Sequence, residues 1–371
     1  LRMIRRRERR EACVIGILYE SDEWSDWKLG RELEAALAEN ALAEAVPAEA
    51  NSQTATRESD AADNSWRHVR MINMEDADAV EQARSCAMLV SRVFASAAFR
   101  GHQRSHRAME DIIALAEAEG IPLINPGRAH HFEIDKRLAT ETLRNAGITA
   151  PAIIAWGTRA ELGRAAADLD DSRSVALSRE EASEAWSPRA SEAEIASHRW
   201  VRPTPDQWTY PCIIKPNCGG RTTHTAVLRS PADARAFLSA APNLVFIVEP
   251  YIEAAGGFLT RIEVVDSRIA LVVKRSVAAS GLSSYHEGST YELYPDCPAA
   301  VTDAVLEAAR ILDIQFGSFD VIEAAEGNFI IDANSVSNVS EDCTELFGFD
   351  LMAAYARALA ARYHTLRNAT N

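Results

Sequence analysis

The strongest chemical signal in this sequence is a lysine that ends an apolar run and is followed by paired glycines. In residues 210–228, YPCIIKPNCGGRTTHTAVL, a predicted buried strand leads to Lys215, and Gly219 and Gly220 follow in a loop. Glycines let backbone N–H groups approach an anion closely, and lysine adds a point charge. The pattern is not a Walker A loop, because its spacing differs and a strand is predicted to follow. The segment predicts either a phosphate-binding loop or a tight hairpin with a surface lysine.

A second signal is the presence of acids in two otherwise apolar segments, GSFDVI (317–322) and NFIIDAN (328–334). Asp332 and Asn334 project to the same face of a strand, because side chains alternate with period two, and Asp320 lies on a neighbouring strand. Carboxylate and amide oxygens suit Mg²⁺ that also carries phosphates, and an unpaired buried carboxylate is costly. The alternative is a set of turn-forming or capping acids.

A third signal is the apolar segment NLVFIVEPYIE (243–253), which contains Glu249 near its end. Such a segment can offer backbone groups to a purine. A strand end with a capping carboxylate explains the same pattern and is the favoured interpretation of this segment taken alone.

The elements that must position these residues follow from the hydrophobic patterning. In the N-terminal third we predict strands at 13–18, 87–94 and 121–125 and helices at 28–46 and 103–120. This alternation predicts a small doubly wound parallel domain. A basic tail (1–12) precedes it, and residues 47–65 have the composition of a loop or a disordered segment.

The rest of the chain changes from helical to β-rich patterning. A helix is predicted over about 133–146, with Ile134, Leu138 and Leu143 on its apolar face, and an insertion over 158–206. Later strands are predicted at 211–216, 224–229, 243–252, 258–265, 268–276, 317–322 and 328–334, with a hairpin turn at Asp266-Ser267. Helices are predicted at 299–312 and from about 350.

Composition limits the kind of protein. The 371 residues allow two or three domains, and a formal net charge of −15 argues against a broad nucleic-acid-binding face. No apolar run approaches 18 residues, so we expect no membrane helix, and we expect no secretory leader. The six cysteines lack zinc or C-x-x-C spacing, which favours free thiols in a cytoplasmic protein.

The order of the candidate residues resembles that of the ATP-grasp superfamily. Lys136, Lys215, Glu249 and the three metal-ligand candidates follow one another as they do in carboxylate–amine ligases such as glutathione synthetases and D-alanine–D-alanine ligases. The segment 120–151, GIPLINPGRAHHFEIDKRLATETLRNAGITAP, is similar to the family's entry into this fold. The resemblance covers about 85–371, with the insertion as a gap.

The resemblance implies an α/β fold class, with α+β character in the ATP-grasp part. A doubly wound pre-ATP-grasp domain would precede a two-lobed ATP-grasp fold. The implied divisions are a tail at 1–12, an α/β domain at 13–130, a small lobe at 131–252 that holds the insertion, and a C-terminal lobe at 253–371 with the Mg²⁺ and substrate sites.

The resemblance also implies roles for individual residues. ATP would contact Lys136, Lys215, Gly219, Gly220, Glu249, Tyr251, Ile252 and, at the ribose, Glu253. Asp320, Asp332 and Asn334 would hold Mg²⁺ or Mn²⁺, Arg261, Lys274 and Arg275 would face substrate or acyl phosphate, and Tyr285 and His286 would touch substrate. Ser318 stands where the D-alanine ligases have an arginine, which argues against that activity.

The implied activity is an ADP-forming ligase that joins a small carboxylate to an amine, such as two amino acids, through an acyl phosphate. A homodimer fits the family. A ligase that modifies a peptide or carrier protein docked by the insertion is an alternative, as is a regulatory protein with a decayed site. We expect Lys215 to be fixed by its strand and Lys136 to be more mobile, and we expect Cys218 to react with thiol reagents if it is exposed.

Overall fold

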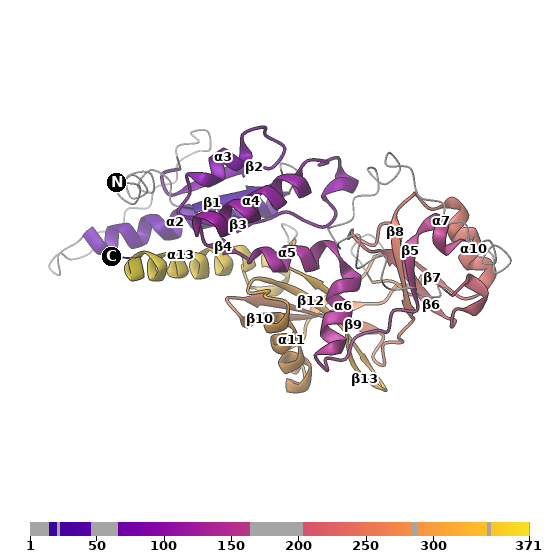
Figure 1. Cartoon of the computed structure of the whole chain (residues 1–371). Coiled ribbons are helices and arrows are strands. Elements are labelled where there is room, and N and C mark those ends of the chain that lie inside the picture. The colour runs from indigo at the N-terminus through magenta and orange to yellow at the C-terminus, as the bar shows by residue number, and fades with distance from the viewer. Residues whose placement is uncertain are drawn as a thin grey trace. The chain divides into compact units, whose positions relative to one another are not determined.

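The computed structural model describes residues 15–20, 23–45, 66–163, 203–283, 288–339 and 343–370. The tail (1–12), the loop 47–65, most of the insertion, and Tyr285 and His286 lie outside these residues. The chain forms two compact units (Figure 1). One unit contains the chain up to Val93, Gly101–Gly127 and the residues from Asn338 onward, and the other contains Phe94–Arg100 and Arg128–Ser337.

The first unit is built on a parallel sheet of order β2-β1-β3-β4. Its strands are β1 (Ile15–Tyr19), β2 (Val69–Asn73), β3 (Met88–Ser91) and β4 (Leu123–Ile124). β1 and β3 are apolar runs and are almost wholly buried, as parallel strands between helices are. β2 and helix α3 (Ala79–Arg84) are absent from the prediction, because polar residues interrupt their short apolar patterns.

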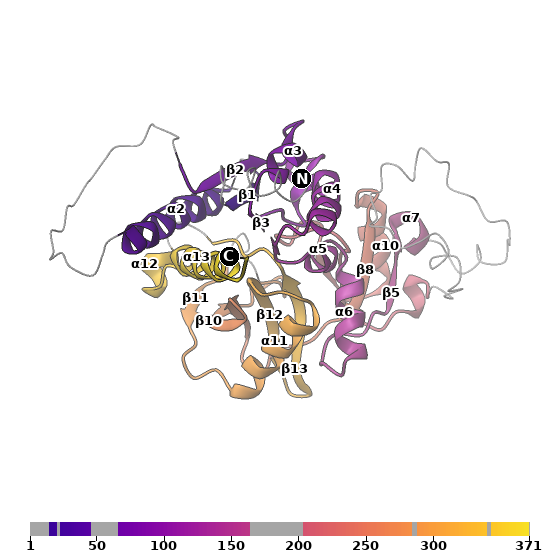
Figure 2. The ribbon, with the colours of Figure 1, turned by 60° about the vertical axis from the view of Figure 1, so that its left-hand side comes forward.

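The helices of this unit come from both the N-terminal and the C-terminal parts of the described chain. They include α2 (Trp24–Ala45), α4 (Ser105–Glu119), α12 (Cys343–Phe347) and α13 (Leu351–Thr370). α13 packs along α2, as Figures 1 and 2 show, and Lys28 Nζ lies 2.9 Å from Asp350 Oδ2. The C-terminal segment therefore differs from the predicted 253–371 lobe, because its apolar stripe is buried in the first unit.

The second unit contains two antiparallel sheets. The first has the order β5-β8-β6-β7 and consists of β5 (Ala155–Thr158), β6 (Cys212–Pro216), β7 (Ala226–Leu228) and β8 (Val245–Pro250). Helices α7 (Arg159–Leu162) and α10 (Pro231–Ala240) and the short 3₁₀ helix η3 (Pro205–Gln207) accompany it. Ile214, Leu238 and Phe246 belong to its core.

The second sheet has the order β11-β10-β9-β12-β13. It consists of β9 (Phe258–Val265), β10 (Arg268–Ser276), β11 (Tyr291–Leu293), β12 (Gly317–Ala324) and β13 (Gly327–Asn334). Helix α11 (Ala299–Ile311) packs on its apolar face. The predicted turn at Asp266-Ser267 is confirmed, with φ angles of 51° and 61°. The predicted combination of α/β and α+β parts is confirmed.

The predicted helix over 133–146 is instead two helices, α5 (Gly127–Ile134) and α6 (Lys136–Asn145). Asp135 separates them, because its side chain accepts a hydrogen bond from Leu138 N at 2.9 Å and so caps α6. Leu138 is 39% exposed, which contradicts its predicted place on an apolar face. The break makes Lys136 the first residue of α6.

Candidate functional site

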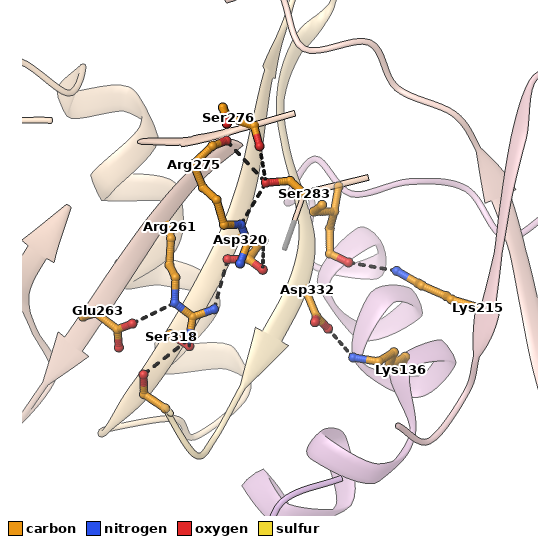
Figure 3. Close-up of polar contacts among 12 residues, drawn as sticks. Lys136, Lys215, Arg261, Glu263, Arg275, Ser276, Ser283, Ser318, Asp320 and Asp332 are labelled. Carbon is orange, nitrogen blue, oxygen red and sulfur yellow. Dashed lines mark hydrogen bonds and ion pairs between the residues drawn. The ribbon is translucent and has the colours of Figure 1, made fainter. Parts of the chain in front are cut away.

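Two carboxylates face each other across the β12–β13 hairpin. Asp320 lies opposite Asp332 in the antiparallel register, and Ser318 lies opposite Asn334. Residues directly opposite each other project to the same face of a sheet, so the three expected metal ligands share one face. Figure 3 shows two of them, Asp320 and Asp332. The structure therefore brings together hard oxygen donors of the kind that bind Mg²⁺.

A β-bulge produces this arrangement. Val321 pairs with Ile330, whereas Asp320 pairs with Asp332, which leaves Ile331 as the extra residue. Val321 and Ile330 are buried in the core beneath the sheet. Strict alternation would have placed Asp332 on the same face as Ile330, because the two residues are two positions apart. The bulge moves Asp332 to the opposite face, beside Asp320.

Two half-buried arginines hold Asp320. Arg275 Nη2 lies 2.9 Å from Asp320 Oδ2 and Arg261 Nη1 lies 3.3 Å from Asp320 Oδ1. Arg261 also donates from Nε to Glu263 Oε1 at 2.9 Å and from Nη2 to Ser318 Oγ at 2.7 Å (Figure 3). Burial opposes the charge of Arg261, but the carboxylates of Glu263 and Asp320 outweigh it and raise the pKa of its guanidinium.

Lys136 pairs with Asp332 (Figure 3). Burial by itself lowers the pKa of Lys136, but the Asp332 and Glu133 carboxylates outweigh it, so this pKa is raised. Burial likewise opposes ionisation of Asp332, yet Lys136 and Lys215 lower the pKa of that carboxyl. The expectation of a mobile Lys136 is wrong, because the N-cap at Asp135 starts α6 there and the ion pair holds the side chain.

Lys215 is fixed as its strand predicts. Its Nζ lies 2.9 Å from Glu249 Oε2 and donates to the backbone oxygen of Ile331 at 3.0 Å. β6 and β8 are neighbours, and Ile213 pairs with Glu249 in their register. Glu249 is 1% exposed, and among the described residues no donor reaches its Oε1. That oxygen can accept a hydrogen bond from a bound group.

The glycine loop after β6 is tied to the start of α6. Asn217 O accepts from Lys136 N at 3.0 Å, and Asn217 Nδ2 donates to Asp135 Oδ1 at 3.1 Å. Gly219 has a φ of 151°, and a Cβ built there would lie 2.5 Å from the ring of Phe99. Only glycine fits at this position, because a side chain would meet both backbone strain and the ring.

A pocket lies between the two sheets of this unit and joins these groups. Lys136, Lys215, Arg275, Asp320 and Asp332 lie at its polar part, together with the glycine loop. Its remaining lining is largely apolar and includes Ile213, Tyr251, Ile252, Ala254, Leu259, Val277, Leu282, Ile322 and Ile331. An apolar slot that also holds several cations and three acids, Glu249, Asp320 and Asp332, suits a flat ring that carries a polyanionic tail.

Lys274 does not lie with the other candidate residues. It pairs with Thr260 in the strand register, whereas Arg275 pairs with Leu259, and adjacent residues of a strand point to opposite faces. Its Nζ lies 4.7 Å and 4.4 Å from the ring centroids of Phe258 and Tyr294. The predicted pairing of Lys274 with Arg275 at one site is therefore wrong.

Two further candidates, Glu253 and Asn334, do not line the pocket. Glu253 is exposed and does not line it, so the expected ribose contact has no support here. Asn334 shares the face of Asp332 but is not among the lining residues. Sequence reasoning missed Leu259 and Ile322, although each is two positions from a candidate residue and alternation alone would have found them. Leu282 and Ser283 belong to the Gly/Ser-rich segment 280–290, in which Tyr285 and His286 were the expected substrate contacts.

Comparison with family models gives no match. A search of the curated proteins gives none either. Solved structures do match. The ATP-grasp ligase PsnB complexed with a minimal precursor is 14% identical with a TM-score of 0.53, and the match covers 95% of this chain and 99% of that one.

Two other matching structures have similar statistics. A RimK domain ATP-grasp protein from Sphaerobacter thermophilus is 16% identical with a TM-score of 0.54, over 93% of this chain and 98% of that one. The D-alanine–D-alanine ligase from Bacillus anthracis is 13% identical with a TM-score of 0.51, over 97% and 100%. The chain has the ATP-grasp fold. Within its described residues, no helix is long and apolar enough to cross a membrane.

Proposed function

We propose that this chain, which has the ATP-grasp fold, is an ATP-dependent ligase that joins a carboxylate to an amine and releases ADP and phosphate. The observation on which the proposal mainly rests is the pocket in which Lys136 and Lys215 face Asp320 and Asp332 beside a glycine loop. Fold likeness alone does not establish an activity, so the proposal depends on these side chains.

The apolar part of the pocket fits an adenine base. Ile213, Leu282 and Ile331 line it, and the free Oε1 of Glu249 would accept a hydrogen bond from an exocyclic amino group. Lys136, Lys215 and the backbone of Gly219 and Gly220 would bind the phosphates. Structures of PsnB that contain ADP or AMPPNP support nucleotide use in this fold.

Asp320, Asp332 and Asn334 fit a divalent cation, because they supply hard oxygen donors on one face of the hairpin. They would hold Mg²⁺ or Mn²⁺, and a PsnB structure contains Mg together with ADP. The bound cation would neutralise charge on the phosphates. Arg275 lies beside these ligands and lines the pocket, so it would hold an anionic substrate or its phosphorylated form. Arg261 does not line the pocket and would act through Asp320, which it contacts.

In the proposed reaction, the substrate carboxylate attacks the γ-phosphorus of ATP, and ADP leaves. The amine then attacks the acyl phosphate carbon. A C–N bond forms, the C–O bond to phosphate breaks, phosphate leaves and the amine proton passes to solvent. The lysines and arginines contribute by orientation and by neutralising negative charge, and the glycine loop would exclude water from the acyl phosphate.

A carboxylate or amine carried by a peptide is a second candidate substrate. PsnB has been solved with a minimal precursor and with a precursor peptide, which favours this class over a regulatory protein without activity. The lysines and acids of the pocket also argue against a decayed site, because each retains its partner.

The test is a phosphate-release screen of amino acids, small carboxylic acids and peptides, singly and in pairs, with Mg²⁺-ATP. We expect at least one acid–amine pair to yield an amide, ADP and phosphate in equal amounts by mass spectrometry and nucleotide chromatography. AMP and pyrophosphate as the main nucleotide products would contradict the proposal, since they indicate an acyl adenylate.

A further inference from the structure

Glu133 lies in the last turn of α5, three residues before Lys136, and does not line the pocket. Its side chain is 4% exposed. Oε1 accepts from Ala95 N at 3.2 Å, and Oε2 accepts from Ser335 N at 2.6 Å and Ser335 Oγ at 3.3 Å. Both carboxylate oxygens are therefore used as acceptors by different segments of the second unit.

The first partner ends the strand that bears the candidate metal ligands. Ser335 directly follows Asn334 and is three residues after Asp332. Hydrogen bonds from Ser335 to Glu133 hold this end of β13 against α5. The position of Glu133 thus bears directly on where the Asp332–Asn334 segment lies.

The second partner belongs to the segment Phe94–Arg100, which supports the glycine loop. Ala95 O accepts a hydrogen bond from Cys218 Sγ at 3.4 Å. The ring of Phe99 lies against Gly219 and makes an edge contact with His224 at 6.1 Å between centroids. A single buried carboxylate therefore connects the support of the glycine loop to the end of the metal-bearing strand.

We propose that Glu133 is a positioning residue that sets the metal-bearing end of β13 relative to the glycine loop. This proposal rests on the proposed function. A glutamine has nearly the same shape but only one acceptor oxygen, so its NH₂ group would face a backbone N–H and leave it unpaired. An aspartate keeps the charge but is one methylene shorter, so it cannot span both partners.

The experiment measures AMPPNP binding by calorimetry as a function of Mg²⁺ concentration, and again with EDTA. For Glu133→Gln we expect the Mg²⁺ concentration at half-effect to rise about tenfold or more, the scale for groups that orient metal ligands. Binding in EDTA should change less than twofold by the same reasoning, because the base and lysine contacts remain. Glu133→Asp should show the same pattern. Ser335→Ala should raise the required Mg²⁺ concentration by less, because its backbone N–H still donates to Glu133.

Glu34 provides a matched control in the first unit. Its carboxylate also accepts three hydrogen bonds, here all from backbone groups: Arg67 N, His68 N and Val69 N at 2.9, 2.8 and 2.9 Å. Glu34→Gln should lower the thermal midpoint and leave the Mg²⁺ dependence unchanged.

Three results would overturn the proposal. Folded Glu133 variants with the parental Mg²⁺ dependence would show that the carboxylate does not position the strand. If Glu133→Asp kept the parental Mg²⁺ dependence while Glu133→Gln lost it, the effect would come from the charge of the carboxylate and not from its placement. Equal losses with and without metal would indicate general destabilisation. A parent that binds AMPPNP neither with nor without Mg²⁺ would instead remove the proposed function, and this proposal with it.

Discussion

At the scale of single residues, the charges around the pocket are arranged as ion pairs of opposite sign. Lys215 pairs with Glu249, Lys136 with Asp332, and Arg275 with Asp320. Removing one member of a buried pair leaves the other charge uncompensated, and the cost depends on how well water reaches the remaining group. The two lysines differ in this respect, because Glu249 is 1% exposed and the Asp332 side chain is 27% exposed.

Lys215→Ala and Lys136→Ala should therefore weaken nucleotide binding to a similar degree but differ in stability. Both lysines are held in place, so each should lose roughly 10- to 100-fold in AMPPNP affinity, the scale of a charge-assisted contact to phosphate. Lys215→Ala should also lose about 3–5 kcal/mol of unfolding free energy, and Lys136→Ala less. Calorimetry and urea unfolding measure the two effects. Parental AMPPNP affinity in Lys215→Ala would mean that the glycine loop is an ordinary hairpin.

Cys218 should react slowly with thiol reagents, although it lies in the glycine loop. Burial raises the pKa of its thiol to about 12, and its Sγ donates to Ala95 O. Only the thiolate is nucleophilic, so alkylation near pH 8 should be slower than for a free thiol by about 1000-fold or more. Its rate should rise with pH up to the thiol pKa. Mass spectrometry after iodoacetamide treatment, with Cys343 as the internal reference, would refute this if both residues were labelled at the same rate.

At the scale of elements, the glycine loop depends on the segment that packs against it. Gly219 and Gly220 are adjacent but differ sharply in the space that a side chain would find there. A Cβ at Gly219 would lie 2.5 Å from Phe99 with φ at 151°, whereas a Cβ at Gly220 would lie 3.9 Å from Ser96 Cβ. The conformation of the loop is thus imposed by Phe99 at one glycine and not at the other.

Gly219→Ala should lower the free energy of unfolding by about 1–3 kcal/mol through strain in the loop, and it should weaken AMPPNP binding. Gly220→Ala should lose less, because its added methyl meets only ordinary contact. Adding Phe99→Ala to Gly219→Ala should recover the steric part of the loss but not the part due to φ. Urea unfolding and calorimetry on the parent, Gly219→Ala, Phe99→Ala and the double variant form a double-mutant cycle. Additive effects of the two substitutions would show that the Phe99 ring does not shape the loop.

At the scale of the whole molecule, stability is divided between two units with their own cores. The first unit is completed by α13, the last helix in the chain, which packs on α2 near the other end of the sequence. Leu359 is fully buried in α13, while Leu366 of the same helix is 39% exposed. Identical substitutions at these positions therefore test whether α13 supports the first unit.

Leu359→Ala should lower the free energy of unfolding by about 2–5 kcal/mol, and Leu366→Ala should lower it by about 0.5 kcal/mol or less. Because the candidate nucleotide pocket is formed by residues of the second unit, folded Leu359→Ala protein should keep its AMPPNP affinity. Thermal unfolding and calorimetry measure both quantities. Equal destabilisation by the two substitutions would show that the buried stripe of α13 does not hold the unit together.

The sequence by itself determined the elements and the chemical types at the site. Apolar runs of the right length predicted β1, β3 and β4 of the first unit, but not β2, and the long strands of the second unit, because such patterns depend only on the local order of residues. The same pattern identified Lys215 at a strand end and the glycines after it. Asp266-Ser267 was predictable as a turn because this polar pair separates two apolar runs, and both residues adopt positive φ in the structure.

Only the tertiary structure decided which of these residues meet. Alternation placed Asp332 and Asn334 on one face, but the bulge at Ile331, set by core packing of Val321 on Ile330, decided that this face is the one with Asp320. The N-cap at Asp135 and the ion pair with Asp332 decided the position of Lys136. The partners of Glu133, and the burial of α13 in the first unit, join segments more than 30 residues apart, which no local pattern records. These features depend on cooperative packing across the chain, so they appear only once the elements are assembled.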